Sequence, residues 1–153
     1  MASELLTIVE VSPVGERKRR RVFDPSSEFP APWWKQNLLA NDADHCLSLY
    51  RDGVEVVRCK FYLSEGPLTD KVLGEMPEGQ LDILAFEVAL SARRQGVGRA
   101  ALKAIREKYP EPRLTALNDN ATSRRFWEGV GWKRHQPTYP HSEDVESVTY
   151  SEV

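Results

Sequence analysis

The sequence has 153 residues, of which 41% are hydrophobic and 29% charged, and its formal net charge at pH 7 is −2. This composition fits one globular domain spanning residues 1–153, with enough apolar side chains to form a core. No apolar run approaches the ~20 residues that cross a bilayer, and the N-terminus lacks the basic start of a signal peptide. We therefore expect a cytoplasmic protein, and the charge balance gives no global argument for binding nucleic acid or membranes.

The N-terminal part of the chain predicts a strand, a basic run and a helix. Residues 4–11 are rich in Leu, Ile and Val, which predicts a strand. The five basic residues at 17–21 either contact phosphates of a nucleic acid or cofactor, or form a solvated loop. A helix is expected to begin near Pro32. It carries Trp33 and Trp34, of which one is expected in the core and the other at a cleft, with two core or rim tryptophans as the alternative.

Asp52-Gly53 gives the strongest hairpin signal in the chain, because it separates two β-rich runs by a two-residue turn. Such a loop places Cys46 across from Cys59 at a non-hydrogen-bonded pair. A disulfide is conceivable there, but in a reducing cytosol two buried thiols that behave as small hydrophobes are favoured. The connection over residues 64–79 is rich in Gly and Pro, and we expect either a lid or acceptor-site wall, or a plain loop.

The central stretch, residues 81–104, predicts a strand followed by an anion-binding turn and a helix. Residues 81–90 are apolar without alternation, which predicts a strand buried on both faces. Gly96 and Gly98 fall where helical spacing begins, so backbone N–H groups there can be approached closely. A helix start of this kind attracts phosphate. Three nearby arginines add fixed positive charge: Arg93, Arg94 and Arg99.

Beyond the glycines, helical spacing continues to about Tyr109, where prolines end it. Residues 114–117 predict a short strand, and the N-cap-rich stretch 118–123 opens a second helix. Two strands close the chain, of which the last spans 145–153. The expected order is therefore strand, helical region, hairpin, central strand, helix, strand, helix and two strands.

The turn after the central strand has the pattern Arg93-x-x-Gly96-x-Gly98, with Val88 preceding it. This pattern resembles the pyrophosphate-binding signature of the GNAT superfamily, the acyl-CoA-dependent N-acyltransferases. Leu90 replaces the usual proline and Arg94 the usual first glycine. Neither change removes a required side chain, because the family uses this turn mainly through its backbone amides.

A second pattern resembles the closing signature of the same family. It reads Asn120-x-x-Ser123-x-x-x-Trp127-x-x-x-Gly131-Trp132 and follows the first in the family's order and spacing. The resemblance covers nearly the whole chain. It implies an α/β (α+β) chain with the GNAT fold, in which a mixed, mostly antiparallel sheet has a splayed central strand pair and helices on both faces.

The resemblance implies acetyl-CoA or a related acyl-CoA as the donor, and no metal. Backbone groups at the end of the central strand would bond to the pantetheine, and amides from Arg94 to Arg99 would hold the pyrophosphate. A backbone N–H near Val88 or Ala89 would polarise the thioester carbonyl. The implied cofactor-binding residues are Val88, Ala89, Leu90, Arg93, Arg94, Gln95, Gly96, Val97, Gly98, Arg99, Asn120, Ser123 and Trp127.

Acyl transfer to an amine needs a base for the amine and a proton for the departing thiolate. Glu87, a carboxylate in an apolar strand, is either that base or the partner of an arginine from a neighbouring element. Asp82 is either a catalytic acid, as in some family members, or a solvated carboxylate at the strand end. Trp127 stands where the family has a tyrosine acid, and its indole has no usable acidity. The proton then comes from water or Tyr139, or the thiolate leaves unprotonated.

The resemblance thus implies an N-acetyltransferase that moves an acetyl or other acyl group from acetyl-CoA to a primary amine of a small molecule or protein. Transfer occurs by direct attack in a ternary complex, with Trp33 and Trp34 at the acceptor wall. Two alternatives are a non-catalytic CoA-binding regulatory module and an acetyltransferase that reaches a nucleic-acid-borne amine through residues 17–21. Homodimers are common in the family, so a homodimer is one expected state.

Overall fold

The structure is a computed structural model that describes residues 5–11, 23–34, 44–118, 121–135 and 148–152. The predicted site residues Asn120 and Tyr139 and the basic run 17–21 lie outside these ranges. The described strands are β1 (Thr7–Glu10), β2 (Asp44–Arg51), β3 (Val54–Ser64), β4 (Leu68–Asp70), β5 (Gly74–Met76), β6 (Gln80–Val88), β7 (Arg113–Asn118), β8 (Lys133–His135) and β9 (Val148–Ser151). The helices are α1 (Val97–Lys108), α2 (Ala121–Gly129) and two short 3₁₀ turns, η1 (Pro32–Trp34) and η2 (Leu90–Ala92).

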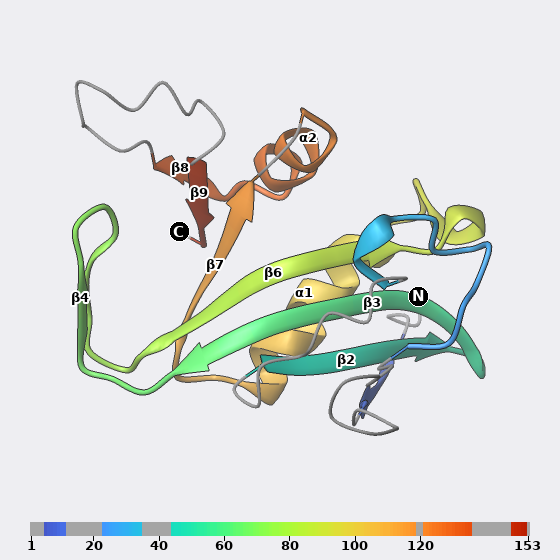
Figure 1. Ribbon diagram of the computed structural model, residues 1–153, viewed down its shortest axis with the longest axis horizontal. Coiled ribbons are helices and arrows are strands. Elements are labelled where there is room, and N and C mark those ends of the chain that lie inside the picture. The colour runs from blue at the N-terminus through green and yellow to red at the C-terminus, as the bar shows by residue number, and fades with distance from the viewer. Residues whose placement is uncertain (1–4, 12–22, 35–43, 119–120, 136–147, 153) are drawn as a thin grey trace. The chain divides into compact units, whose positions relative to one another are not determined.

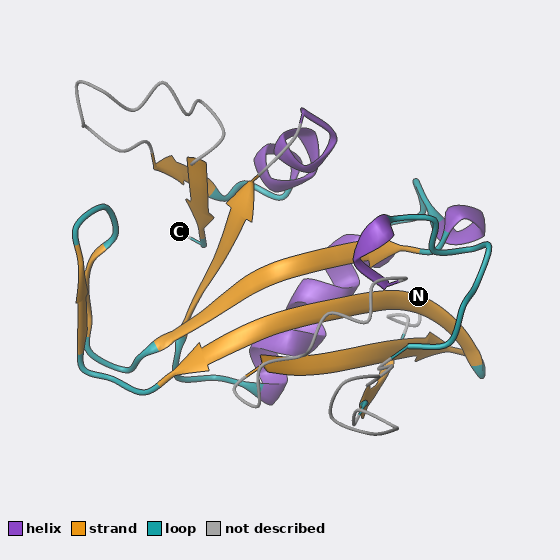
Figure 2. Ribbon diagram, in the orientation of Figure 1, coloured by secondary structure: helices purple, strands orange, loops and turns teal. Residues whose placement is uncertain are grey.

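One mixed sheet has the strand order β1-β2-β3-β6-β7-β9-β8, and β4 pairs with β5 separately (Figures 1 and 2). The β6–β7 pair is parallel, whereas β1–β2, β7–β9 and β8–β9 are antiparallel. This arrangement confirms the predicted mixed, mostly antiparallel sheet. The chain divides into two compact units, one of Met1–Phe61 with Ala85–Tyr109 and one of Tyr62–Leu84 with Pro110–Val153.

In the first unit, the predicted hairpin is confirmed. Asp52 and Gly53 both have positive φ, 52° and 78°, as the tight turn between β2 and β3 requires. Cys46 and Cys59 are buried thiols that form no disulfide, as expected of small hydrophobes. Burial raises the pKa of the Cys59 thiol, and the neighbouring Cys46 adds to this.

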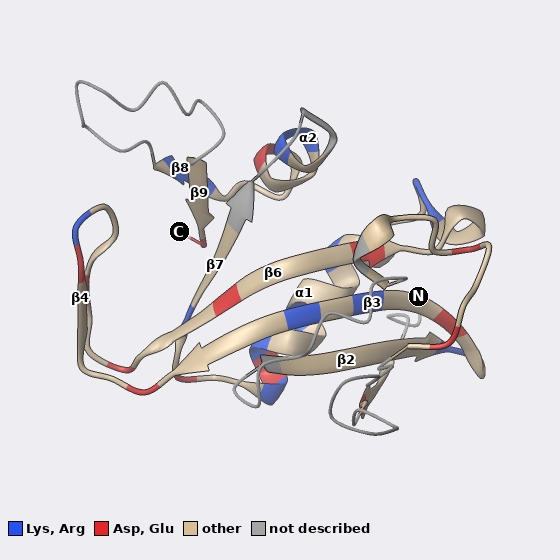
Figure 3. Cartoon of the chain, viewed as in Figure 1, with Lys and Arg blue, Asp and Glu red and all other residues tan. Residues whose placement is uncertain are grey.

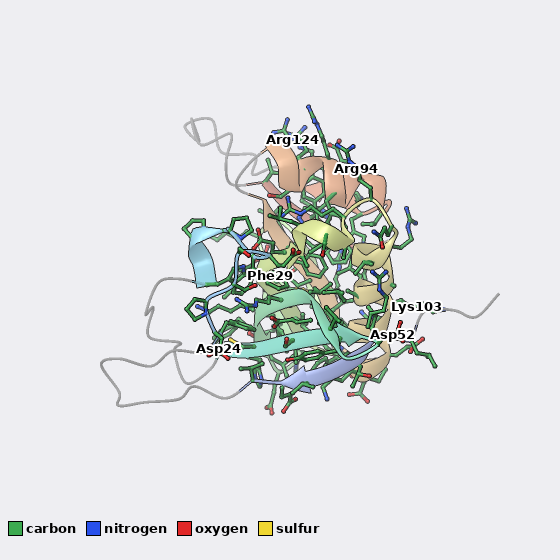
Figure 4. All side chains as sticks on the ribbon, turned by 90° about the vertical axis from the view of Figure 1, so that its right-hand side faces the viewer. Asp24, Phe29, Asp52, Arg94, Lys103 and Arg124 are labelled. Carbon is green, nitrogen blue, oxygen red and sulfur yellow. The ribbon has the colours of Figure 1, made fainter. Side chains whose placement is uncertain are left out.

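Two elements of the first unit cover opposite faces of β3. Arg58 lies under Phe29 of the 23–34 segment, whereas Phe61 packs against Tyr109 at the end of α1. Because side chains alternate along a strand, positions 58 and 61 point to opposite faces. Figure 4 shows this arrangement, with Phe29 on one side of the strands and Lys103 of α1 on the other.

The prediction that the central strand is buried on both faces is wrong. Along β6, buried residues alternate with more accessible ones, and Leu84 is 39% exposed. Leu81, Ile83, Ala85 and Glu87 make up the buried set. Leu84, Phe86 and Val88 at the intervening positions are also apolar, and they hid the two-residue period from the sequence pattern.

In the second unit, the connection over residues 64–79 is not the plain loop that was one alternative. This segment contains the hairpin β4–β5, with Leu68 opposite Met76 and Asp70 opposite Gly74. The turn forms because Asp70 Oδ1 accepts N–H bonds from Val72 and Leu73 at 2.8 and 2.9 Å. Its strands are too short for a periodicity signal.

β6 and β7 pair over four positions, from Gln80 opposite Arg113 to Ile83 opposite Ala116, and β6 runs on to Val88. The helices α1 and α2 begin and end close to the residues predicted for them. Within the described part of the chain, neither helix has both the length and the apolar character needed to span a bilayer.

Candidate functional site

β6 leads into α1 through a turn in which two residues are left-handed. Arg93 is extended, with φ −68° and ψ 153°, and Arg94 then has φ 63°. Gly96, at φ 74°, is the N-cap of α1, and its carbonyl accepts the Ala100 N–H at 3.0 Å. The N–H groups of the first turn of a helix point out of its N-terminus, and Gly96 has no side chain with which to cap them. This arrangement binds phosphate in many proteins.

Hydrogen bonds with two residues distant in sequence, Arg51 and Glu28, stabilise this turn. Gln95 Nε2 donates to the Ser91 carbonyl at 3.1 Å, while its Oε1 accepts Arg51 Nη2 at 3.0 Å. The Glu28 carboxylate accepts both the N–H and the hydroxyl of Ser91 at 2.8 Å, and its backbone carbonyl accepts the Leu90 N–H at 3.0 Å. The bond from the Ser91 N–H, and then that from its hydroxyl, lower the pKa of Glu28. Sequence reasoning missed Glu28, since no motif surrounds it.

Arg93 folds back onto the end of β6. Its Nε donates to the Val88 carbonyl at 3.0 Å, and its Nη2 donates to Glu87 Oε2 at 3.2 Å. The Ala89 N–H donates to the Val56 carbonyl at 2.8 Å. Because backbone groups alternate along a strand, Val88 directs its own N–H and carbonyl toward the opposite edge. Of the two amides predicted to polarise a thioester, Ala89 is therefore engaged by β3, and Val88 is the better placed.

The buried carboxylate of Glu87 accepts hydrogen bonds from three residues. Trp34 Nε1 donates to its Oε1 at 2.7 Å, and the Ala31 N–H lies 3.3 Å from both carboxylate oxygens. The side chain of Glu87 is 9% exposed, whereas that of its ion-pair partner Arg93 is 43% exposed. The predicted pairing with an arginine is present, but the arginine comes from the turn after the same strand and not from a neighbouring element.

Trp34, predicted at the acceptor wall, is 7% exposed and packs edge-on against Phe23 with ring centroids 4.8 Å apart. Its indole N–H is directed at Glu87. Trp33 lies in the same 3₁₀ turn. Trp34 therefore takes the core position that was expected of one tryptophan.

Arg58 anchors the 23–34 segment over β3. It is 2% exposed, donates to Glu55 Oε1 and to the Asp24 carbonyl, and lies 4.3 Å from the Phe29 ring centroid and 5.0 Å from that of Phe23. Sequence reasoning missed this residue, although a lone arginine within the apolar run of β3 is a signal that could have found it.

Asp82 lies in the second unit and is not the solvated carboxylate considered as an alternative. Thr115 Oγ1 donates to its Oδ1 at 2.8 Å, and Gln80 Nε2 donates to Thr115 Oγ1 at 2.9 Å. Burial raises the pKa of Asp82, the Thr115 bond opposes this, and the nearby Asp70 adds to the increase. A carboxyl of this kind can hold a proton closer to neutral pH than an exposed one.

The comparisons with known proteins agree with the turn geometry. The sequence profile of the Acetyltransferase (GNAT) family matches residues 14–132. The chain belongs to this family. No protein with a curated description matches the sequence.

Three solved structures illustrate the likeness in fold. An acetyltransferase from Thermus thermophilus has a TM-score of 0.50 and 15% identity, covering 76% of this chain and 67% of its own. AtaT complexed with acetyl-methionyl-tRNAfMet has a TM-score of 0.56 and 12% identity, covering 95% and 93%. AtaTR bound with AcCoA has a TM-score of 0.56 and 12% identity, covering 95% and 91%. At these identities the likeness is one of fold.

In this GNAT chain the closing signature forms an aromatic cluster in the second unit. Trp127 is 3% exposed, stacks on Trp132 with centroids 4.6 Å apart, and meets Phe126 edge-on at 4.8 Å. Ser123 lies one turn earlier on α2 and is half-buried. The indole at the usual tyrosine position thus packs with other aromatic rings, which gives this position a core role.

A second polar cluster in the GNAT chain joins β7, β8 and β9. His135 Nε2 and Arg113 Nη2 lie 2.7 and 2.9 Å from the buried Ser151 Oγ. Burial lowers the pKa of His135, and the positive charges of Arg113 and Lys133 lower it further, against a smaller opposite effect of Asp70. Sequence reasoning missed this cluster because its residues are dispersed along the chain.

Proposed function

We propose that the protein transfers an acetyl group from acetyl-CoA to a primary amine of a small molecule or protein, by direct attack in a ternary complex. The observation that carries this proposal is the turn from β6 to α1, where left-handed Arg94 and Gly96 present the uncapped N-terminus of α1. This geometry suits the pyrophosphate that the family's signature predicts there. The related AtaTR structure contains AcCoA.

The proposed donor site uses backbone groups first and charged side chains second. Val88 to Leu90 would bond to the pantetheine, and the amides of residues 94–99 would hold the pyrophosphate. Arg94 and Arg99 are exposed and supply positive charge beside those amides. From the closing signature, Asn120 and Ser123 remain donor contacts that the family resemblance implies, whereas Trp127, at 3% exposure, is proposed to support its helix from the core.

In the proposed chemistry, Glu87 accepts one proton from the ammonium form of the acceptor. The amine lone pair then forms a C–N bond to the thioester carbonyl, which the Val88 N–H polarises. The C–S bond breaks with its electron pair on sulfur, and a second proton from the nitrogen ends on the thiolate through water or Tyr139. Glu87 returns its proton to solvent, so the products are the N-acetylated amine, CoA and one released proton. Asp82 is kept as a separate proposal of the family resemblance, and its raised pKa suits a carboxyl that can hold a proton.

A second candidate acceptor is an amine carried on a nucleic acid. Basic residues lie along α2 and β8 (Figure 3), and Arg125, Lys133 and Arg134 are exposed. The structure of AtaT contains acetyl-methionyl-tRNAfMet. RNA binding that weakens steeply with salt would support this acceptor, because phosphate contacts release counterions.

The donor proposal is tested by calorimetry with acetyl-CoA. Gly96→Glu places a carboxylate at the proposed phosphate site, and we expect it to weaken binding at least tenfold. Gly53→Glu is the matched control, because Gly53 also has positive φ, at 78°, and open space around its Cα. If wild type does not bind acetyl-CoA, or if both variants lose binding equally, the proposed site is wrong.

Catalysis is tested by thiol release from acetyl-CoA across a panel of primary amines. Release that depends on one amine class supports the enzyme and identifies its acceptor. Acetyl-CoA binding without release for any amine would instead support the non-catalytic CoA-binding module.

A further inference from the structure

The Arg93 side chain occupies two groups that the proposed reaction uses. Its Nε is bonded to the Val88 carbonyl at 3.0 Å, where the pantetheine is proposed to bind. Its Nη2 is bonded at 3.2 Å to Glu87 Oε2, an oxygen of the proposed base. One side chain thus competes with the acyl donor at one atom and engages the base at another.

The two partners of this ion pair differ in their freedom to move. The Glu87 side chain is 9% exposed and is also held by Trp34 Nε1 and the Ala31 N–H. The Arg93 side chain is 43% exposed, and both of these bonds are to the end of β6. Half-exposed ion pairs are weak enough to exchange partners, so Arg93 is the member that can leave.

The backbone provides a second position for the Arg93 guanidinium. Arg93 lies three residues before Gly96, the N-cap of α1, and it is extended while the next residue is left-handed. A long arginine side chain starting there can lie along β6 or swing toward the N-terminus of α1. A diphosphate at that helix end would attract it, since arginine donates two parallel bonds to phosphate oxygens.

We propose that Arg93 is a positioning residue that frees Glu87 only when the acyl donor binds. This inference rests on the proposed acetyl-CoA function. A pantetheine amide N–H that bonds to the Val88 carbonyl displaces Arg93 Nε. The displaced guanidinium then binds the pyrophosphate of the donor. Glu87 Oε2 then loses its ion pair, while Oε1 keeps its bond from Trp34 and the base stays oriented. The reaction is therefore ordered, with the donor binding before the amine.

Fragments of the donor separate the two halves of this exchange. Pantetheine, which lacks phosphates, must displace Arg93 without offering it a new partner. In Arg93→Gln the charged competitor at Val88 is gone, so we expect pantetheine to bind about tenfold more tightly than to wild type. CoA should bind Arg93→Gln no more tightly than wild type, because the variant also loses the arginine–phosphate contact.

Two further variants control for charge. In Arg93→Lys a single ammonium group replaces the planar guanidinium, so the affinity for CoA should stay near that of wild type. The affinity for pantetheine should lie between those of wild type and Arg93→Gln. Lys103→Gln removes an exposed charge from α1 and should leave both affinities unchanged. If pantetheine binds Arg93→Gln no more tightly than wild type, the proposed role of Arg93 is wrong.

A measurement on wild type avoids dependence on the fold of the variants. The Arg93 Nε–H signal in a ¹⁵N-correlated NMR spectrum should shift when CoA is added, whereas the Trp34 indole N–H signal should shift less. An unchanged Arg93 signal at saturating CoA overturns the inference and leaves the proposed function intact. Failure of wild type to bind CoA at all would instead overturn the proposed function.

Discussion

Glu87→Gln should lower both the stability of the protein and its rate of acetyl transfer. The glutamine amide oxygen can keep the bond from Trp34 Nε1 and can still accept the Ala31 N–H, which lies 3.3 Å from both carboxylate oxygens, but its NH2 group then faces the Arg93 Nη2 donor. A hydrogen bond to a charged acceptor contributes about 1.5–3 kcal/mol and one to a neutral acceptor about 0.5–1.5 kcal/mol, so weakening the bonds from Trp34 and Ala31 together costs about 1–3 kcal/mol. Loss of the ion pair with Arg93, which is 43% exposed and turns to water, adds less than about 1 kcal/mol.

The free energy of unfolding should therefore fall by about 2 kcal/mol, which lowers the melting temperature by about 4–8 °C in a protein of this size. If Glu87 is the base, the rate of thiol release with the best amine should fall at least about 100-fold while acetyl-CoA still binds. Urea unfolding followed by circular dichroism and the thiol-release assay measure the two effects.

Glu107→Gln is the matched control, because it makes the same chemical change at an exposed position of α1. If the two variants unfold at the same urea concentration, the hydrogen bonds of Glu87 do not stabilise the 23–34 segment. If Glu87→Gln is destabilised but transfers acetyl at the wild-type rate, Glu87 only anchors that segment and is not the base.

Three further predictions concern titratable and charged side chains that have partners within the fold. Because the pKa of His135 is lowered in the fold, the unfolded chain binds more protons than the folded chain near pH 6. The free energy of unfolding should therefore fall as the pH drops below about 6.5. His135→Gln should flatten this dependence in urea titrations at pH 5.5 and 7.5. Asp82→Asn should raise the melting temperature at pH 7, because burial raises the pKa of Asp82 and its ionised form therefore destabilises the fold. At pH 3 the variant should not raise the melting temperature, because Asp82 is then protonated in both the folded and the unfolded chain. Arg58→Met should lower the free energy of unfolding by about 3 kcal/mol because it leaves the partly buried Glu55 without this partner. The double variant Arg58→Met/Glu55→Met should recover part of that loss, and equal losses in the single and double variants would contradict the reasoning.

Local sequence was enough to predict the elements whose conformation depends on neighbouring residues. Asp52-Gly53 predicts its tight turn because Asp tolerates and Gly favours positive φ, and both residues adopt it. Gly96 marks the start of α1 for the same reason. The β4–β5 hairpin escaped prediction because its strands are three residues each and its turn is held by one aspartate side chain.

The site was predictable as a motif but not as a set of contacts. The pattern around Gly96 indicated the family and the phosphate turn, because uncapped amides need only local backbone geometry. The partners of Glu87 could not be read in the same way, since Ala31 and Trp34 lie more than fifty positions away in the chain. Local sequence patterns do not indicate which distant segment of the chain packs over a given strand.

The sequence by itself therefore determined the order of elements, the turn that leads into α1, and membership of the GNAT family, all of which depend on short-range backbone preferences and motif spacing. Only the tertiary structure decided that Arg93 folds back onto Glu87 and Val88, that Glu28 holds the turn through Ser91, and that Trp127 lies in an aromatic cluster. These contacts depend on packing between segments that are distant in sequence or on a side chain reversing its direction. Both depend on the shape of the folded chain and not on local conformational preference.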